Sequence, residues 1–178
     1  MSKNSHIIFK GLKIVSWIIF IGLCIEAGAL LVNFVMSLFY PEIIKNLYQK
    51  LDLHDLYLLN KWAYFGLFTF ILMIAVLKAF LFYLVIDLLS KLDMMKPFNA
   101  FVSKQITRIS YCTLSIGILG YVAQESIKPF SEANLDLNSL DTFWPDSQAF
   151  ILMAAVIYVI AQIFAKGVEL QTENELTV

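Results

Sequence analysis

Two opposite charges, Glu26 and Lys78, lie well inside apolar segments of this sequence. A lone charge at the centre of a membrane helix costs roughly 2.5–3.5 kcal/mol even on insertion scales, so we expect each charge to have a partner or a function. As a functional site, Glu26 could titrate or bind a cation, and Lys78 could bind an anionic head group or solute. As a structural lock, the two charges would neutralise each other and fix two helices, although a buried ion pair contributes uncertain net stability.

Four long apolar runs must position these charges, at about residues 12–40, 62–89, 106–127 and 147–167. A helix needs about 20 apolar residues to cross a hydrocarbon core of about 30 Å, and each run is long enough. The hydrophobic fraction of 60% exceeds the roughly 45–50% that soluble domains reach even with glycine included. The sequence therefore predicts an all-α, polytopic membrane four-helix bundle, with residues 1–178 as a single transmembrane domain.

Small and polar residues recur at helical spacing within these runs, which marks the faces expected to meet protein instead of lipid. The stripe on the first run consists of Gly22, Glu26, Ala29, Asn33 and Ser37. At about 1.5 Å of rise per residue, Glu26 lies about 18 Å and Lys78 about 13 Å from the inner boundary. The lysine side chain can span this gap, so we expect the two charges to meet. The predicted intramembrane polar cluster consists of Glu26, Asn33, Lys78, Thr113, Gln124, Tyr158 and Gln162.

Lysine and arginine residues are distributed unequally between the two ends of the predicted spans. Eight of them flank the N-terminus, the second loop and the end of the last span, whereas four flank the first and third loops. Short cytoplasmic loops are enriched in these residues. We therefore expect both termini and the middle loop in the cytoplasm, with the first and third loops outside.

The first outer loop is expected to carry a short amphipathic helix on the outer surface. Pro41 fits the first helical position. The apolar residues that follow at helical spacing are Ile43, Ile44, Leu47, Tyr48 and Leu51. Asp52 and Asp55 are then expected to cap a helix that runs from about residue 53 into the second span.

Several function classes lack their residue patterns in this sequence. The only histidines, His6 and His54, lie outside the apolar runs, so we expect no intramembrane catalytic set, no metal site, no cofactor and no enzymatic activity. Charge is balanced, with 13 basic and 14 acidic residues, which does not favour direct binding of nucleic acid. Two hypotheses remain: a binding or regulatory membrane protein with a cytoplasmic partner, or a small-solute or proton-coupled transporter that uses Glu26 and Lys78.

The ends predicted to be cytoplasmic carry the most specific local sequence. The first motif is Lys96-Pro97-Phe98-Asn99, followed by Gln105, Ile106 and Arg108. The second is the terminal segment Gly167-x-Glu169-Leu170-Gln171-x-Glu173-Asn174-Glu175-Leu176-Thr177-Val178. Together they resemble a bacterial family of four-span inner-membrane proteins called domain of unknown function 2975. Family members usually follow the Pro-Phe with a Glu-Asn pair, where this chain has Ala100 to Ser103.

The resemblance implies a bacterial inner-membrane location but no established activity. It also implies a partner, because members are often encoded beside small helix-turn-helix regulators. The predicted cytoplasmic partner surface consists of Lys96, Pro97, Phe98, Arg108, Glu169, Glu173, Asn174 and Glu175. Its acidic tail could either pack on the basic middle loop or be released to a partner. Small-residue faces at Cys24 to Gly28 or at Ala161 to Ala165 could also serve a homodimer.

Overall fold

All regular elements in the described part of the chain are helices. The computed structural model describes residues 3–92, 98–131, 140, 143–144 and 146–176. The four long helices are α1 (Lys3–Phe39), α3 (Lys61–Lys91), α4 (Ala100–Ser131) and α5 (Ser147–Leu176). Each contains a segment that is long and apolar enough to cross a membrane. The predicted all-α fold with four spans is therefore confirmed, and the chain is a multi-pass membrane protein.

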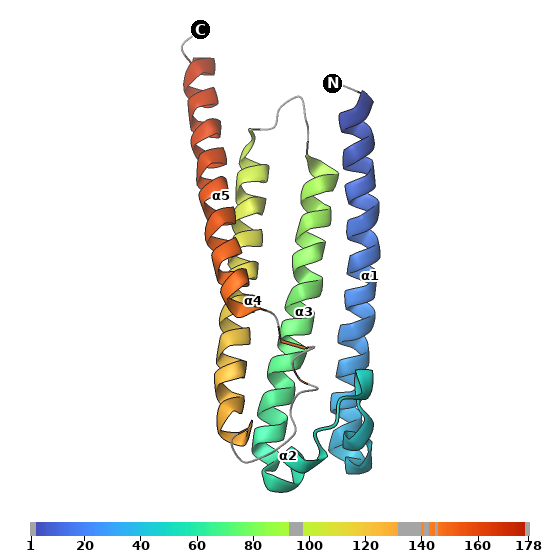
Figure 1. The fold of residues 1–178 in the computed structure, drawn as a ribbon. Coiled ribbons are helices and arrows are strands. Elements are labelled where there is room, and N and C mark those ends of the chain that lie inside the picture. The colour runs from blue at the N-terminus through green and yellow to red at the C-terminus, as the bar shows by residue number, and fades with distance from the viewer. Residues whose placement is uncertain (1–2, 93–97, 132–139, 141–142, 145, 177–178) are drawn as a thin grey trace.

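The long helices follow one another in space in their chain order, α1, α3, α4 and α5 (Figure 1). Packing is most extensive between α4 and α5, and it is also extensive between α1 and α3 and between α3 and α4. Helices that are not neighbours in this order make at most slight contact in the described residues. The arrangement is thus an open row whose edges are α1 and α5.

The start of α1 and the end of α5 lie at the same end of the row (Figure 1). We call this end, which also holds Lys91 and Ala100, the termini end. The opposite end holds three short helices, which are η1 (Pro41–Asn46), η2 (Tyr48–Lys50) and α2 (His54–Leu59). We call it the loop end. The even number of antiparallel spans agrees with the predicted placement of both termini on one side.

At the termini end the helices continue past the predicted apolar runs. α1 begins at Lys3 instead of residue 12, α4 begins at Ala100 instead of residue 106, and α5 ends at Leu176 instead of residue 167. At the loop end, by contrast, α1, α3 and α5 begin or end within one residue of the runs. About nine residues of extra helix add about 13 Å of length. The termini end therefore carries helical segments whose sequence is polar.

The packing face of α1 overlaps the predicted stripe only in part. Leu30 is fully buried, and Phe34 packs on Phe65 and Phe68 of α3. Gly22, which the stripe includes, has open space around it. Membrane helices associate through close van der Waals contact, so the large side chains define this face. Within the stripe Ser37 is buried, whereas Glu26 and Asn33 lie half-buried at the edge of the packing face.

The loop after α1 forms two short 3-10 helices instead of one α-helix. Leu47 is extended between them, and Gln49 has a φ of 57°. Three apolar residues of the predicted amphipathic segment, Ile44, Leu47 and Leu51, are buried in the same core as Phe68. The segment is thus helical and amphipathic as expected, and its apolar face packs on the bundle.

The helix expected from about residue 53 is interrupted before the second span. Asp52 Oδ1 accepts a hydrogen bond from the His54 backbone N–H at 2.9 Å, but α2 ends at Leu59. Asn60 then caps α3, because its Oδ1 accepts from the backbone N–H groups of Trp62 at 3.0 Å and Ala63 at 3.3 Å. The prediction of a continuous helix was wrong, since it overlooked Asn60, one of the residues that most favour an N-cap.

Candidate functional site

A continuous polar network joins α3 to α4 at the termini end. Lys91 Nζ lies 2.7 Å from Asp87 Oδ1, one helical turn away on α3. Gln105 of α4 is only 1% exposed, and its Nε2 donates to Asp87 Oδ2 at 3.1 Å and to the Leu84 carbonyl at 3.3 Å. The amide oxygen of Gln105 in turn accepts a bond from Arg108 Nη1 at 3.5 Å. The buried amide therefore links the two helices and holds the side chains of Asp87 and Arg108 in place.

This network forms one end of a groove between α3 and α4. The groove has a volume of about 750 Å³. Its lining passes from the charged residues at the termini end to apolar and aromatic residues deeper in the span: Leu77, Phe80, Tyr83, Leu84, Asp87, Lys91, Gln105, Arg108, Tyr111, Cys112 and Ser115. A site of this kind can hold a ligand that has a charged group at one end and an apolar body.

Close approach of α4 and α5 depends on small residues. A Cβ added at Gly117 would lie 2.8 Å from the Ile151 side chain and 3.1 Å from its backbone nitrogen. Nearer the termini end, the buried hydroxyl of Ser110 donates to the Ala154 carbonyl at 2.9 Å. Ser103 makes a longer bond of the same kind to the Ala161 carbonyl, at 3.4 Å. These contacts fix α5 against α4 along most of its span.

The end of α5 is held by an aromatic contact. The ring of Phe98 lies 5.2 Å from that of Phe164, and a Cβ at Gly167 would approach it to 2.6 Å. Beyond this contact, Glu169 is exposed and pairs with Lys166 of the same helix at 2.8 Å. Glu173 is also exposed on α5. Of the predicted partner surface, Phe98 thus contacts α5, and Glu169 and Glu173 follow on the same helix beyond this contact.

Other members of the predicted partner surface lie elsewhere. Arg108 belongs to the groove between α3 and α4, not to the contact between Phe98 and α5. Lys96 and Pro97 lie outside the described residues, and so do the side chains of Asn174 and Glu175. The described part of the predicted surface is therefore divided between two helix pairs.

Glu26 and Lys78 lie at similar depths on neighbouring helices. Ring contacts fix the register of α1 against α3 through Phe20 with Tyr83 and Phe34 with Phe68. Because α1 and α3 are antiparallel, counting along both helices from these contacts places Glu26 at the height of about residue 76 of α3. Lys78 lies two residues, or about 3 Å, from that height. Both side chains are half-buried. The ion pairs within 4 Å among the described residues do not include this pair.

The remaining residues of the predicted intramembrane cluster do not converge on the two charges. Thr113 is buried, but its hydroxyl donates to the Ile109 carbonyl of its own helix at 2.8 Å. Tyr158 stacks on Tyr111, with ring centroids 6.1 Å apart. Asn33 and Gln124 are half-buried, whereas Gln162 is exposed. In the described part of the chain no hydrogen bond or ion pair joins any two of the seven predicted side chains. The row of helices explains this, because α1 and α5 lie at opposite edges.

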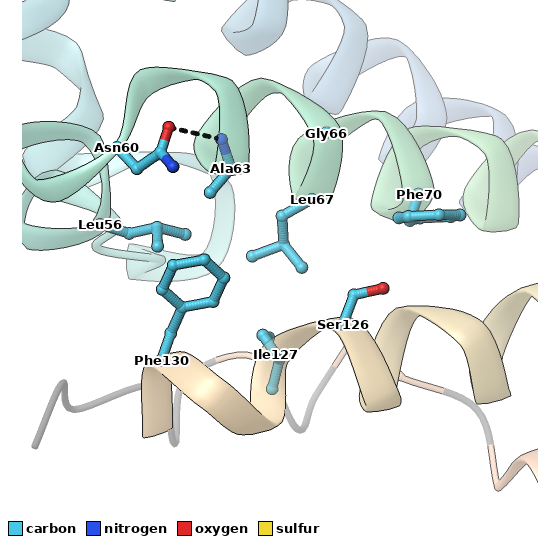
Figure 2. A pocket seen from close by; sticks show the side chains of 9 residues that line it. All are labelled: Leu56, Asn60, Ala63, Gly66, Leu67, Phe70, Ser126, Ile127 and Phe130. Atoms are coloured by element: carbon cyan, nitrogen blue, oxygen red, sulfur yellow. Dashed lines mark hydrogen bonds between the residues drawn. The ribbon is translucent and has the colours of Figure 1, made fainter. Parts of the chain in front are cut away.

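A smaller pocket of about 330 Å³ lies at the loop end, between the start of α3 and the end of α4. Figure 2 shows Leu56, Leu67 and Phe130 pointing into the space between the two helices. Asn60 also lines it, with its oxygen engaged in the cap of α3. The side chains around this pocket are mostly apolar, and it lacks charged lining residues among those described.

Sequence reasoning missed the two residues that organise the groove, Asp87 and Gln105, as members of a site. A usable signal was present. Asp87 and Lys91 are spaced i,i+4, Gln105 and Arg108 are spaced i,i+3, and both pairs lie at the same predicted membrane boundary. Two polar pairs at one end of consecutive antiparallel spans are expected to meet.

Comparison with known protein families matches residues 37–178 to the family described as Protein of unknown function (DUF2975). The match starts near the end of α1 and includes the groove, the contact between Phe98 and α5, and the predicted surface residues. No curated protein and no solved structure matches the chain. The matched segment contains most of the chain, and the protein therefore belongs to the DUF2975 family.

Proposed function

We propose that the protein is a membrane-embedded binding protein that engages a cytoplasmic protein with its termini end. One observation carries this proposal: α5 continues as an unbroken helix past the apolar run and exposes Glu169 and Glu173. The unequal distribution of lysine and arginine supports a cytoplasmic position for this end. We call the segment from Val168 to Leu176 the acidic extension.

The contact between Phe98 and Gly167 supports presentation of the acidic extension in a defined direction. Since Gly167 has no side chain, the ring of Phe98 lies directly against α5 where the extension begins. Glu169 pairs with Lys166 of its own helix, which favours presentation over packing on the middle loop. A helix held in one direction loses less conformational freedom on binding than a disordered tail would.

The partner that we propose is a small helix-turn-helix regulator, the class that the family resemblance implies. A DNA-binding face of such a protein is basic, because it must neutralise phosphates. Glu169 and Glu173 would complement that charge. Binding at the membrane would then compete with binding to DNA, which gives the protein a regulatory role.

Site-specific photocrosslinking in living cells tests the proposal. A photoreactive amino acid replaces Glu169 in the full-length protein, and the matched control carries it at Lys45, which is exposed at the loop end. We expect a soluble DNA-binding protein to be crosslinked at position 169 but not at position 45, with a lower yield when Glu173→Lys is added. Equal crosslinking at both positions, or none at position 169, would contradict the proposal.

A second candidate function is small-solute or proton-coupled transport through Glu26 and Lys78. The similar depth of these half-buried charges favours it, since they lie on neighbouring helices without a direct ion pair. Glu26→Gln and Lys78→Met separate the two hypotheses. Loss of proton-coupled flux in liposomes at unchanged thermal stability would favour transport. A lower thermal stability without any flux in the native protein would favour a structural lock.

A further inference from the structure

We infer that the groove between α3 and α4 binds a phospholipid with an anionic headgroup, whose phosphate contacts Arg108 and whose acyl chain lies along α3. This site lies apart from the acidic extension and does not depend on the proposed protein partner. The groove opens at the boundary of the predicted spans, where lipid phosphates are located. Its volume of about 750 Å³ falls in the range of ligand sites, roughly 300–1,000 Å³.

The charged side chains at the termini end of the groove differ in whether they have a charged partner. Asp87 is engaged by Lys91 and by the amide of Gln105. Arg108, the only arginine in the sequence, is exposed and bonds to the neutral oxygen of Gln105 at 3.5 Å. None of the ion pairs within 4 Å in the described residues includes Arg108. Its planar guanidinium is therefore available to a phosphodiester, which it can bind through two parallel hydrogen bonds.

The depth of Arg108 suits a lipid headgroup better than a solute in water. It follows the predicted membrane boundary at residue 106 by two residues, or about 3 Å. A long basic side chain at this position extends its charge toward the interface while its stem stays in the apolar layer. Tyr83 and Tyr111 are half-exposed deeper in the same groove, and aromatic residues of this kind are common near lipid headgroups.

The rest of the groove suits an acyl chain. Phe80 is 49% exposed and stacks on Tyr83 with an interplanar angle of 23°, so two aromatic rings lie side by side along the groove. Leu77 and Cys112 line the deeper part. Leu77 and Lys91 lie fourteen residues apart along α3, a length of about 21 Å, which exceeds the roughly 15 Å of hydrocarbon in one leaflet. A chain in this groove would fill space that the two helices leave between them.

The charge balance favours an anionic over a zwitterionic headgroup. Asp87 is already paired, so a headgroup ammonium would have no unpaired carboxylate among the groove residues. Lys91 and Arg108 give the termini end of the groove a net positive charge when Asp87 is counted. Phosphatidylglycerol, which carries one phosphodiester charge and no ammonium, meets these requirements.

Native mass spectrometry of the delipidated full-length protein tests this inference with three probes. These are phosphatidylglycerol, phosphatidylcholine with the same chains, and glycerol phosphate, which supplies a negatively charged phosphate without the chains. We expect one tight phosphatidylglycerol site, binding of phosphatidylcholine weaker by about tenfold, and no comparable binding of glycerol phosphate. Equal binding of the two lipids would overturn the inference. Binding of glycerol phosphate as tight as that of the lipid would show a site for free phosphate instead.

Two variants and a control locate the site. Arg108→Gln should weaken the tight phosphatidylglycerol site about tenfold, whereas Lys128→Gln at the loop end should leave it unchanged. Phe80→Ala removes an exposed ring that lines the groove without changing charge, so it should weaken the binding of both lipids. It also keeps the inference testable if Arg108→Gln fails to fold. Unchanged phosphatidylglycerol binding in Phe80→Ala and in a folded Arg108→Gln would overturn the inference, as would an equal loss in Lys128→Gln.

Discussion

The two ends of this helical row differ in what fills the space between helices. At the loop end, fully buried Ile44, Leu56, Tyr64 and Phe68 form one apolar core with the short helices η1 and α2. At the termini end, a buried amide at Gln105 supports charged side chains, and a groove of about 750 Å³ stays open beside them. The loop end thus holds the larger apolar core of the row, and the termini end is where we propose that binding takes place.

The largest expected effect is a difference in stability between aromatic truncations at the two ends. Phe68→Ala should lower the free energy of unfolding by about 3–5 kcal/mol, since its ring is fully buried against Phe34 and Tyr64. Phe98→Ala should cost about 1 kcal/mol, because the ring of Phe98 is 43% exposed. Unfolding of the full-length protein in detergent measures both values. Similar costs at the two positions would contradict the larger contribution of the loop end to stability.

A second prediction concerns two glycines, whose replacement by alanine should change the free energy of unfolding in opposite directions. Gly117→Ala should destabilise the protein by about 1–2 kcal/mol, because overpacking costs about 1–3 kcal/mol and alanine regains part of this through its helix propensity. Gly66→Ala should stabilise it by about 0.5–1 kcal/mol, because a Cβ there meets open space. The same unfolding experiment compares the two variants. The packing of α4 on α5 would need revision if both substitutions were stabilising.

The smallest difference between the two ends is expected at the helix caps, where the two ends should behave alike. Asn60→Ala removes the cap of α3 at the loop end, and Asn99→Ala removes the bond to the Val102 backbone N–H, 2.9 Å long, at the start of α4. Each should cost about 1 kcal/mol, the typical value for an N-cap. Thermal scans of the two variants should therefore show similar shifts. A shift at only one end would mean that the other cap does not stabilise its helix.

The number of spans and the loop-end borders of α1, α3 and α5 were predictable, because apolar composition ends where those helices end. Hydropathy carries no comparable signal for the polar start of α4 or for the acidic extension, since a helix outside the membrane needs no apolar sequence. The break at Asn60 was also missed, although the residue type indicates a cap.

Contacts between helices were the least predictable part of the site. Depth along each run led to the prediction that Glu26 and Lys78 meet, but the described ion pairs do not include them. The packing face of α1 is set mainly by Leu30 and Phe34, and the polar stripe contributes only part of it. The buried position of Gln105 depends on how α3 and α4 pair, which composition alone does not specify. The polar pairs were visible in the sequence. That they join into one network across α3 and α4 could be seen only in the structure.

Cysteine labelling tests directly whether the termini end, with its acidic extension and its groove, faces the cytoplasm. In a background with Cys24 and Cys112 replaced, single cysteines are placed at Lys45 and at Glu169, both exposed. A membrane-impermeant maleimide is added to intact and to permeabilised cells. We predict that Lys45→Cys reacts in intact cells and that Glu169→Cys reacts only after permeabilisation. Labelling of Glu169→Cys in intact cells, with Lys45→Cys protected, would contradict the account.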